Sequence, residues 1–255
     1  MDAIFAISDI HGEEEKARKL LNHWNPDKEQ LVLLGDLVDR GENSLGVILL
    51  AMELQQKYGA KVIGGNHDDM LLDWIDDPNG QLDMYYPQGG IQTINSFFDQ
   101  NIAMRKLPEH IATLMKEQFP NELEFLRSLP NYYEQGKHVF VHAGVNLAYE
   151  DWKNTSDIDF RWIRHLFHYG RNDTGKIFVF GHTPTRNLNP DRSHNVWISP
   201  CQTKIGIDGG AVYGGLMHGL RINEDGEYDA LSIDREFNVF RSKLSLRQPA
   251  ITIPF

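Results

Sequence analysis

The sequence predicts an α/β protein built around a largely parallel sheet. Three short apolar runs, residues 3–8, 31–34 and 61–63, each lead into a polar loop, and a helical pattern follows each loop. Successive strand–loop–helix units favour parallel strands with right-handed crossovers, because each helix returns the chain to the same end of the sheet. A chain of 255 residues is long enough for one such domain with a well-buried core.

The first two units place charged side chains just beyond their strands. Asp9 and His11 follow the first strand, and residues 13–24 then have the spacing of an amphipathic helix. The second strand breaks at a glycine and is followed by Asp36, Asp39 and Arg40, before a helix predicted over residues 45–57. Parallel strands carry their chemistry at these carboxyl ends. Taken alone, the second loop is equally compatible with a turn that caps the helix.

The third unit leads into a helical insert. A loop with Asn66, His67 and Asp68 follows its strand, and residues 70–130 are mostly helical in pattern, with two breaks rich in Pro and Gly. We expect this insert to flank or cover a site. Its aromatic side chains could stack on a base or a peptide ring, although we favour packing for all five: Trp74, Tyr85, Tyr86, Phe97 and Phe98.

Strands resume in the second half of the chain. They are predicted at residues 138–142, 177–180, 196–199, 204–207, 216–222 and 228–233. We assign residues 1–240 to a single domain, since neither a linker nor an internal repeat marks a second one. Residues 241–255 form a tail that is either an edge strand or a loosely held arm.

Composition restricts the class of protein. With 41% hydrophobic and 24% charged residues the chain is typical of soluble globular proteins, and a net charge of -11 argues against a nucleic-acid surface, which needs clustered Lys and Arg. The single cysteine, Cys201, excludes an internal disulfide and favours a reducing compartment. No signal peptide and no uncharged apolar run of about 18 residues is evident. We therefore expect a cytoplasmic protein without a membrane span; its oligomeric state is left open.

Five of the strand ends carry side chains that bind divalent metal ions. Each residue alone has an ordinary explanation, such as a core histidine, a turn or a helix cap. Together, carboxylate, imidazole and amide oxygen suit Mn, Fe or Zn better than Ca. Six residues make up this candidate ligand set, with Asp36 placed to bridge two ions: Asp9, His11, Asp36, Asn66, His142 and His182.

Five motifs resemble, in order, the signatures of the calcineurin-like metallophosphoesterases. They are DIHG at 9–12, GDLVDRG at 35–41, GNHD at 65–68, VHAG at 141–144 and GHTP at 181–184. The resemblance covers residue 3 to about residue 220 and is closest to the phosphoprotein phosphatase branch, especially small bacterial and bacteriophage serine/threonine protein phosphatases. It implies a double β-sheet sandwich flanked by helices. It also implies two divalent ions, Mn or alternatively Fe or Zn, and hydrolysis by a hydroxide that bridges them.

The resemblance further implies the roles of individual residues. One ion is held by Asp9, His11 and the bridging Asp36, and the other by Asp36, Asn66, His142 and His182. His67 matches the acid that protonates the leaving oxygen, and Asp39 matches the carboxylate paired with it. Arg40 matches a phosphate-holding arginine; Arg164, in preference to Arg161, matches a second one.

Departures from the phosphatase pattern bear on the substrate. Asp68 stands where protein phosphatases usually have Glu, as in hydrolases that cut diadenosine tetraphosphate symmetrically, but those hydrolases usually lack Asp39. Asp208 and Tyr213 resemble a family segment and serve either the site or the fold. We expect a phosphatase acting on phosphomonoesters, chiefly phosphoserine or phosphothreonine in proteins. The alternatives are a diadenosine tetraphosphate hydrolase and a catalytically inactive metal-binding scaffold.

Overall fold

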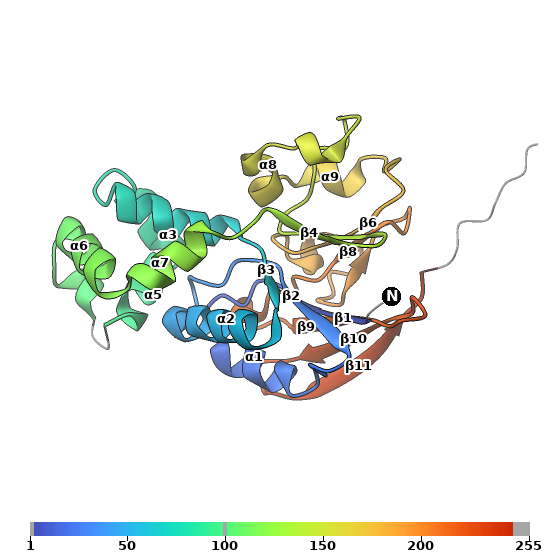
Figure 1. Ribbon diagram of the computed structural model, residues 1–255, viewed down its shortest axis with the longest axis horizontal. Helices are drawn as coiled ribbons and strands as arrows, with labels where there is room; N and C mark the ends of the chain where they lie inside the picture. The colour runs from blue at the N-terminus through green and yellow to red at the C-terminus, as the bar shows by residue number, and fades with distance from the viewer. Residues whose placement is uncertain (1–2, 99–100, 247–255) are drawn as a thin grey trace, which may run out of the picture.

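The computed structural model describes residues 3–98 and 101–246 (Figure 1). Two β-sheets pack face to face, and helices cover their outer faces. The larger sheet has six strands in the order β11-β10-β9-β1-β2-β3, and the smaller has five in the order β4-β5-β6-β8-β7. This arrangement confirms the predicted α/β fold with two sheets flanked by helices.

The first three strands are parallel, as predicted. β1 (Ala3–Ile7) pairs with β2 (Glu29–Leu33), and β2 pairs with β3 (Lys61–Val62). The other half of this sheet is antiparallel and consists of β9 (Met217–Ile222), β10 (Tyr228–Ile233) and β11 (Val239–Leu244). Short turns join these last strands, and a short connection can only reverse the chain, so the pairing there is antiparallel.

The smaller sheet has a parallel centre and antiparallel edges. Its central strands are β5 (His138–Val141), β6 (Ile177–Phe180) and β8 (Lys204–Gly206), and its edges are β4 (Tyr132–Gln135) and β7 (Trp197–Ile198). The sequence did not predict β4. Its four side chains are all half-buried, so they lack the apolar alternation that reveals a strand, and pairing with β5 determines its conformation.

Side chains of the central strands alternate between two layers of core. Ile4 and Ala6 of β1 point between the sheets, where they pack with Phe140 and Val179. The intervening side chains point outward to the helices α1 (Glu14–Leu21) and α2 (Ser44–Tyr58). A third layer joins the smaller sheet to α8 (Asp157–Trp162) and α9 (His165–Tyr169). Because both faces of each sheet are buried, the central strands are apolar throughout.

The predicted insert is a helical lobe beside the larger sheet (Figure 1). It consists of α3 (Asn66–Asp76), α4 (Leu82–Tyr85), α5 (Gly90–Ser96), α6 (Pro108–Gln118) and α7 (Pro120–Arg127). Short 3-10 helices complete the chain: η1 (Tyr86–Gln88), η2 (Ile102–Met104), η3 (Trp152–Asn154), η4 (Thr185–Asn187) and η5 (Ala211–Tyr213). Of the predicted tail, the first residues belong to the edge strand β11, and residues 247–255 lie outside the described part.

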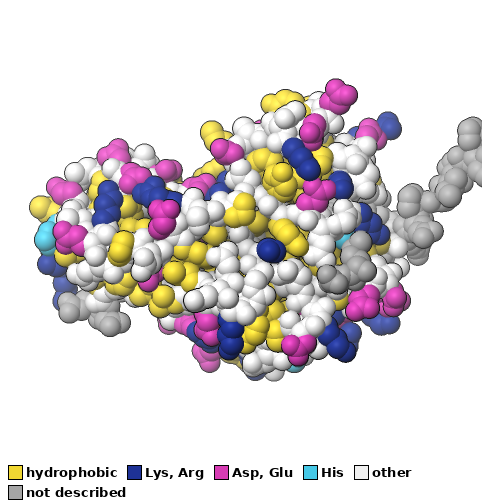
Figure 2. Space-filling model, viewed as in Figure 1, with side chains coloured by type: hydrophobic (Ala, Val, Ile, Leu, Met, Phe, Trp, Pro, Cys, Tyr) yellow, Lys and Arg dark blue, Asp and Glu magenta, His cyan; other side chains and the backbone are white. Residues whose placement is uncertain are grey.

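Two surface properties bear on the expected partners. None of the helices in the described part of the chain has the length and hydrophobicity that crossing a membrane requires. On the face that Figure 2 shows, Lys and Arg side chains are interspersed with Asp and Glu, and the described residues form no broad basic area there. That face offers no extended site for a nucleic-acid backbone.

A buried histidine of β9 makes stability depend on pH. Nε2 of His218 donates to the carbonyl of His194 at 2.7 Å, and Nδ1 accepts from the Ser232 hydroxyl at 2.7 Å, so the neutral ring is satisfied. Burial lowers the pKa of His218 to about 4. Since the ordinary pKa is higher, its contribution is complete above about pH 6.5 and is lost as the pH falls toward 4.

We predict that wild-type protein loses roughly 2 kcal/mol more than His218→Gln between pH 6.5 and 4.5, because glutamine does not titrate. Urea unfolding at both pH values measures the difference. Parallel pH dependences for the two proteins would contradict the role of His218.

Candidate metal centre and active site

The carboxyl ends of strands from both sheets meet at one site. The backbone N–H of His182, which follows β6, donates to both carboxylate oxygens of Asp9, which follows β1, at 3.0 Å. His142, which follows β5, reaches the carbonyl of Leu34 at the end of β2, at 2.8 Å. The structure thus brings together all six predicted metal ligands, each 6% exposed or less: Asp9, His11, Asp36, Asn66, His142 and His182.

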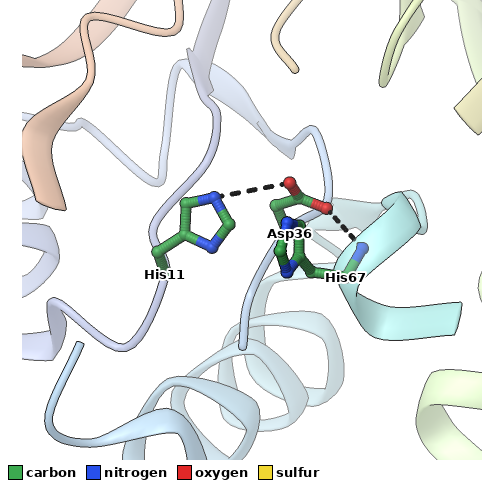
Figure 3. Close-up of side chains that lie close together, drawn as sticks. All are labelled: His11, Asp36 and His67. Carbon is green, nitrogen blue, oxygen red and sulfur yellow. Dashed lines mark hydrogen bonds and ion pairs between the residues drawn. The ribbon is translucent and has the colours of Figure 1, made fainter. Parts of the chain in front are cut away.

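The Asp36 carboxylate lies between two groups of ligand atoms. Its Oδ2 is 3.4 Å from Nε2 of His11, and its Oδ1 accepts from the backbone N–H of His67 at 2.9 Å (Figure 3). On the other side, Oδ1 is 3.3 Å from Nε2 of His142. One group comprises atoms of His11, Asp36 and His67, and the other atoms of Asp36, His142 and His182. Asp36 is therefore shared by both groups.

Asn66 adds an amide oxygen to the second group. At the first position of α3, its Oδ1 lies 3.0 Å from Nε2 of His142 and 2.7 Å from Nδ1 of His182. Nε2 of His182 is buried and has no hydrogen-bond partner within the described residues. An amide oxygen beside two imidazole nitrogens suits a transition-metal ion rather than calcium.

Backbone carbonyls orient two of the imidazoles. Nδ1 of His11 donates to the carbonyl of Val38 at 2.7 Å, and Nδ1 of His142 donates to that of Leu34 at 2.8 Å. These bonds fix the ring protons on Nδ1 and leave both Nε2 lone pairs near the Asp36 carboxylate. Metal-binding histidines are typically held in this way. Donor types and orientation thus fit two divalent ions that share Asp36.

Asp9 lies beside these two groups. In addition to the His182 N–H, its carboxylate accepts from the Ser8 hydroxyl. Burial, followed by the negative charges of Asp208 and Asp36, raises the pKa of the Asp9 carboxyl well above its ordinary value. A cation would offset this crowding of buried carboxylates. The assignment of Asp9 as a metal ligand stays a prediction.

Backbone strain is concentrated at this site. Nine non-glycine residues in the described part of the chain have positive φ, and six of these are predicted site residues: Asp9, His11, Asp36, Asp39, Arg40 and His182. This conformation costs about 1–2 kcal/mol per residue and is found preferentially at functional sites. Gly65 permits the close packing of the loops, because a Cβ there would overlap the Asp36 carboxylate.

His67 and Asp39 form a buried pair. Nδ1 of His67 is 2.7 Å from Oδ2 of Asp39. Burial of the ring opposes protonation, but the charges of Asp36 and Asp39 and the hydrogen bond to Asp39 outweigh it and raise the pKa of His67. The ring is therefore biased toward the protonated form, which is the form that can donate a proton to a leaving group.

Two side chains of the insert hold Asp39, and the sequence did not predict them. The Tyr85 and Thr93 hydroxyls donate to Oδ1 of Asp39 at 2.8 and 2.7 Å, and the Asp39 N–H donates to Thr93 Oγ1 at 2.8 Å. Tyr85 is fully buried, so its hydroxyl has a polar role within an otherwise apolar position. The only nearby signal in the sequence is Gly89, whose carbonyl accepts from the Arg40 N–H at 3.4 Å.

Asp68 ties two loops together through backbone hydrogen bonds. Its Oδ2 accepts from the N–H groups of Asp36 and Gly65 at 3.0 and 2.8 Å, and its Oδ1 accepts from Leu37 at 3.0 Å. Burial, then the charge of Asp36, raises the pKa of Asp68 to about 7. The departure from the phosphatase pattern at this position therefore falls on a residue that positions Asp36.

Arg40 lies against the first group of ligand atoms. Nη2 donates to Nε2 of His67 at 2.6 Å, and Nη1 donates to Nε2 of His11. Because Nε2 of His11 has one lone pair, it binds either the guanidinium or a metal ion. The ring of Tyr213 packs on the other side of the guanidinium, at 5.2 Å.

The two candidates for the second arginine have different surroundings. Arg161 is 8% exposed and donates to three groups: the carbonyls of Gly65 and Leu129, at 3.2 Å, and the carboxylate of Asp69, at 2.8 Å. Arg164 is exposed at the rim and donates to the Thr183 hydroxyl at 2.8 Å, beside the ligand loop of β6. Only Arg164 is accessible to a substrate from solvent.

Fold and site together define a two-sheet α/β protein with a buried, metal-ligating centre. The calcineurin-like phosphoesterase family matches residues 3–229, and the chain belongs to that family. This match confirms the resemblance of the five motifs. Members of the family depend on a dinuclear metal centre, and both groups of ligand atoms described above agree with one.

Relatives of the chain differ in substrate. The chain is 27% identical over 249 residues to the asymmetrical bis(5'-nucleosyl)-tetraphosphatase PrpE of Anoxybacillus flavithermus, with 86% of this chain and 89% of the relative covered. It is 26% identical over 224 residues to serine/threonine-protein phosphatase 1 of Salmonella typhimurium, covering 86% and 91%. A crystal structure of a mutant cold-active protein tyrosine phosphatase shares the fold, with a TM-score of 0.57, 17% identity, and 96% and 81% covered.

Substitutions should separate the shared ligand from an unshared one. We predict that Asp36→Asn abolishes binding of both manganese ions, because both groups lose their common carboxylate, whereas Asn66→Ala loses only one of the two. Metal content per chain after dialysis, measured by plasma mass spectrometry, distinguishes these outcomes. Retention of two ions by Asp36→Asn would contradict the bridging role.

The two arginines should differ in stability and activity. Arg161→Ala removes buried hydrogen bonds and should lower the free energy of unfolding by more than about 2 kcal/mol. Arg164→Ala should change it by less than about 0.5 kcal/mol but reduce kcat/KM roughly 10- to 100-fold. Urea unfolding and steady-state kinetics of both variants test this, and the reverse pattern would assign the phosphate contact to Arg161.

Proposed function

We propose that the protein is a two-metal phosphatase for phosphomonoesters with poor leaving groups, chiefly phosphoserine and phosphothreonine in proteins. The buried His67–Asp39 pair, joined at 2.7 Å, carries this proposal. A serine or threonine alkoxide needs a proton as the phosphorus–oxygen bond breaks. A histidine whose pKa is raised by neighbouring carboxylates is suited to supply it.

Each predicted site residue has a place in this mechanism. Two ions, Mn or alternatively Fe or Zn, would be held by Asp9, His11, Asp36, Asn66, His142 and His182. When bound, such ions neutralise phosphate charge and lower the pKa of coordinated water. Arg40 and Arg164 orient the phosphoryl oxygens through charge-assisted hydrogen bonds. His67 transfers a proton from Nε2 to the leaving oxygen, while Asp39 holds the ring through Nδ1.

A second candidate function is the hydrolysis of dinucleoside tetraphosphates. The similarity to the PrpE tetraphosphatase over 86% of the chain favours it. Here the leaving group is a nucleotide phosphate, which needs less protonation than an alkoxide, so His67 should matter less. The inactive scaffold is disfavoured, because the ligand positions and the His67–Asp39 pair are all occupied by functional side chains.

The variant His67→Asn tests the proposed function. With manganese, its kcat on a phosphoserine peptide should fall roughly 10²- to 10⁴-fold, because the alkoxide leaves unprotonated. The fall on p-nitrophenyl phosphate should be smaller, since nitrophenolate leaves readily. Metal content is the control and should match that of wild-type protein.

Equal losses on both substrates would argue against His67 as the proton donor. Wild-type turnover of the phosphoserine peptide and of diadenosine tetraphosphate, measured in parallel, decides between the two functions. A higher kcat/KM on diadenosine tetraphosphate would replace the first proposal by the second.

A further inference from the structure

A cavity of about 360 Å³ opens beside Arg40, on the side away from the metal ligands. Three segments that are distant in sequence form its walls: the loop after β2, the η1–α5 segment of the insert, and η5. Six side chains face it: Arg40, Tyr86, Gln88, Ile91, Gln92 and Tyr213. Its volume is that of a site for one small molecule of nucleoside size rather than for a folded peptide.

The walls of this cavity are fixed by close backbone contact. Gly89 has a φ of 108°, and its carbonyl accepts from the N–H of Arg40 at 3.4 Å. A Cβ at Gly89 would overlap the Arg40 backbone, so only glycine allows the insert to approach this closely. The insert wall is therefore held in a constant position relative to the phosphate-binding loop.

The side chains combine flat rings with free amides. The Tyr213 ring is 62% exposed and packs on the Arg40 guanidinium at 5.2 Å, and Tyr86 contributes a second, half-buried ring. The side chains of Gln88 and Gln92 are exposed and make no hydrogen bond within the described part of the chain. Arg40 is the only charged residue among those that line the cavity.

One guanidinium connects the cavity with the active site. Arg40 contacts His67 and His11 on one side and the Tyr213 ring on the other. A phosphate held by Arg40 would thus lie between the metal ligands and the cavity. The group attached to that phosphate is the part of a substrate that can enter the cavity.

We infer that this cavity binds a nucleobase, which rests on the second candidate function and names its nucleoside subsite. Aromatic rings stack on bases of any sequence, and glutamine amides pair with the donor and acceptor edges of a base. A phosphoserine peptide would place an aliphatic backbone there and leave both amides unpaired. The geometry points to a nucleotide whose base lies against Tyr213 and whose edge is bonded by Gln88 and Gln92.

Inhibition of the manganese-loaded enzyme tests this without requiring that a dinucleotide be hydrolysed. AMP and ribose 5-phosphate carry the same phosphate and sugar, and only AMP has a base. With p-nitrophenyl phosphate as reporter substrate, AMP should inhibit at least 10-fold more tightly than ribose 5-phosphate. In the double variant Gln88→Ala/Gln92→Ala this ratio should fall about 10-fold, with kcat/KM on the reporter changed less than twofold.

The control variant Gln118→Ala removes an exposed glutamine on α6, in the same lobe but away from the cavity, and should keep the wild-type ratio. Equal inhibition by AMP and ribose 5-phosphate would overturn the subsite. So would an unchanged ratio in the double variant, or a phosphoserine peptide with a flanking aromatic residue that loses as much affinity as AMP.

Failure of the function itself gives a different result. If the loaded protein does not turn over p-nitrophenyl phosphate, calorimetric titration with AMP and ribose 5-phosphate measures the same ratio as dissociation constants. A 10-fold preference for AMP would then support the subsite in a protein without the proposed activity, and equal affinity would overturn it.

Discussion

The geometry of the site depends on where one carboxylate is held. Burial opposes ionisation of Asp36, but the four histidines that surround it outweigh burial and hold the pKa of its carboxyl below the ordinary value. Its N–H is bound by Asp68, and its Oδ1 accepts from the first turn of α3. Because the same two oxygens face ligands from both sheets, the position of this one side chain sets the relation between the two halves of the centre.

That position is maintained at a cost in backbone conformation. The site residues with positive φ require well-packed strands on either side, since such turns are unfavourable by themselves. Parallel strands buried on both faces supply this support. A rigid double sheet and strained loops are thus complementary: the first stabilises what the second needs for ligand placement.

The sequence predicted the parts of this structure that are encoded locally. Apolar runs ending in Asp, Asn or His identified β1, β2, β3, β5 and β6 together with the metal ligands, because the strand and its terminal residue are adjacent in the chain. Residues defined by distant contacts were missed. Tyr85 and Thr93 acquire their role only when the insert folds against Asp39, and β4 exists only because β5 lies beside it. Arg161 and Arg164 differ by burial, which a three-residue spacing does not reveal.

The tether formed by Arg161 has a consequence for the helical lobe. One guanidinium binds Gly65, where the lobe begins, and Leu129, where it ends, and the N–H of Gly64 donates to the carbonyl of Pro130 at 3.0 Å. The lobe therefore leaves and rejoins the sandwich at a single closed neck. Lengthening a segment whose ends are already joined adds little entropy cost, about 0.6 kcal/mol per doubling. Evolution could thus enlarge, shrink or exchange this lobe, and with it the choice of what enters the site, while the ion-binding framework below the neck stays as it is.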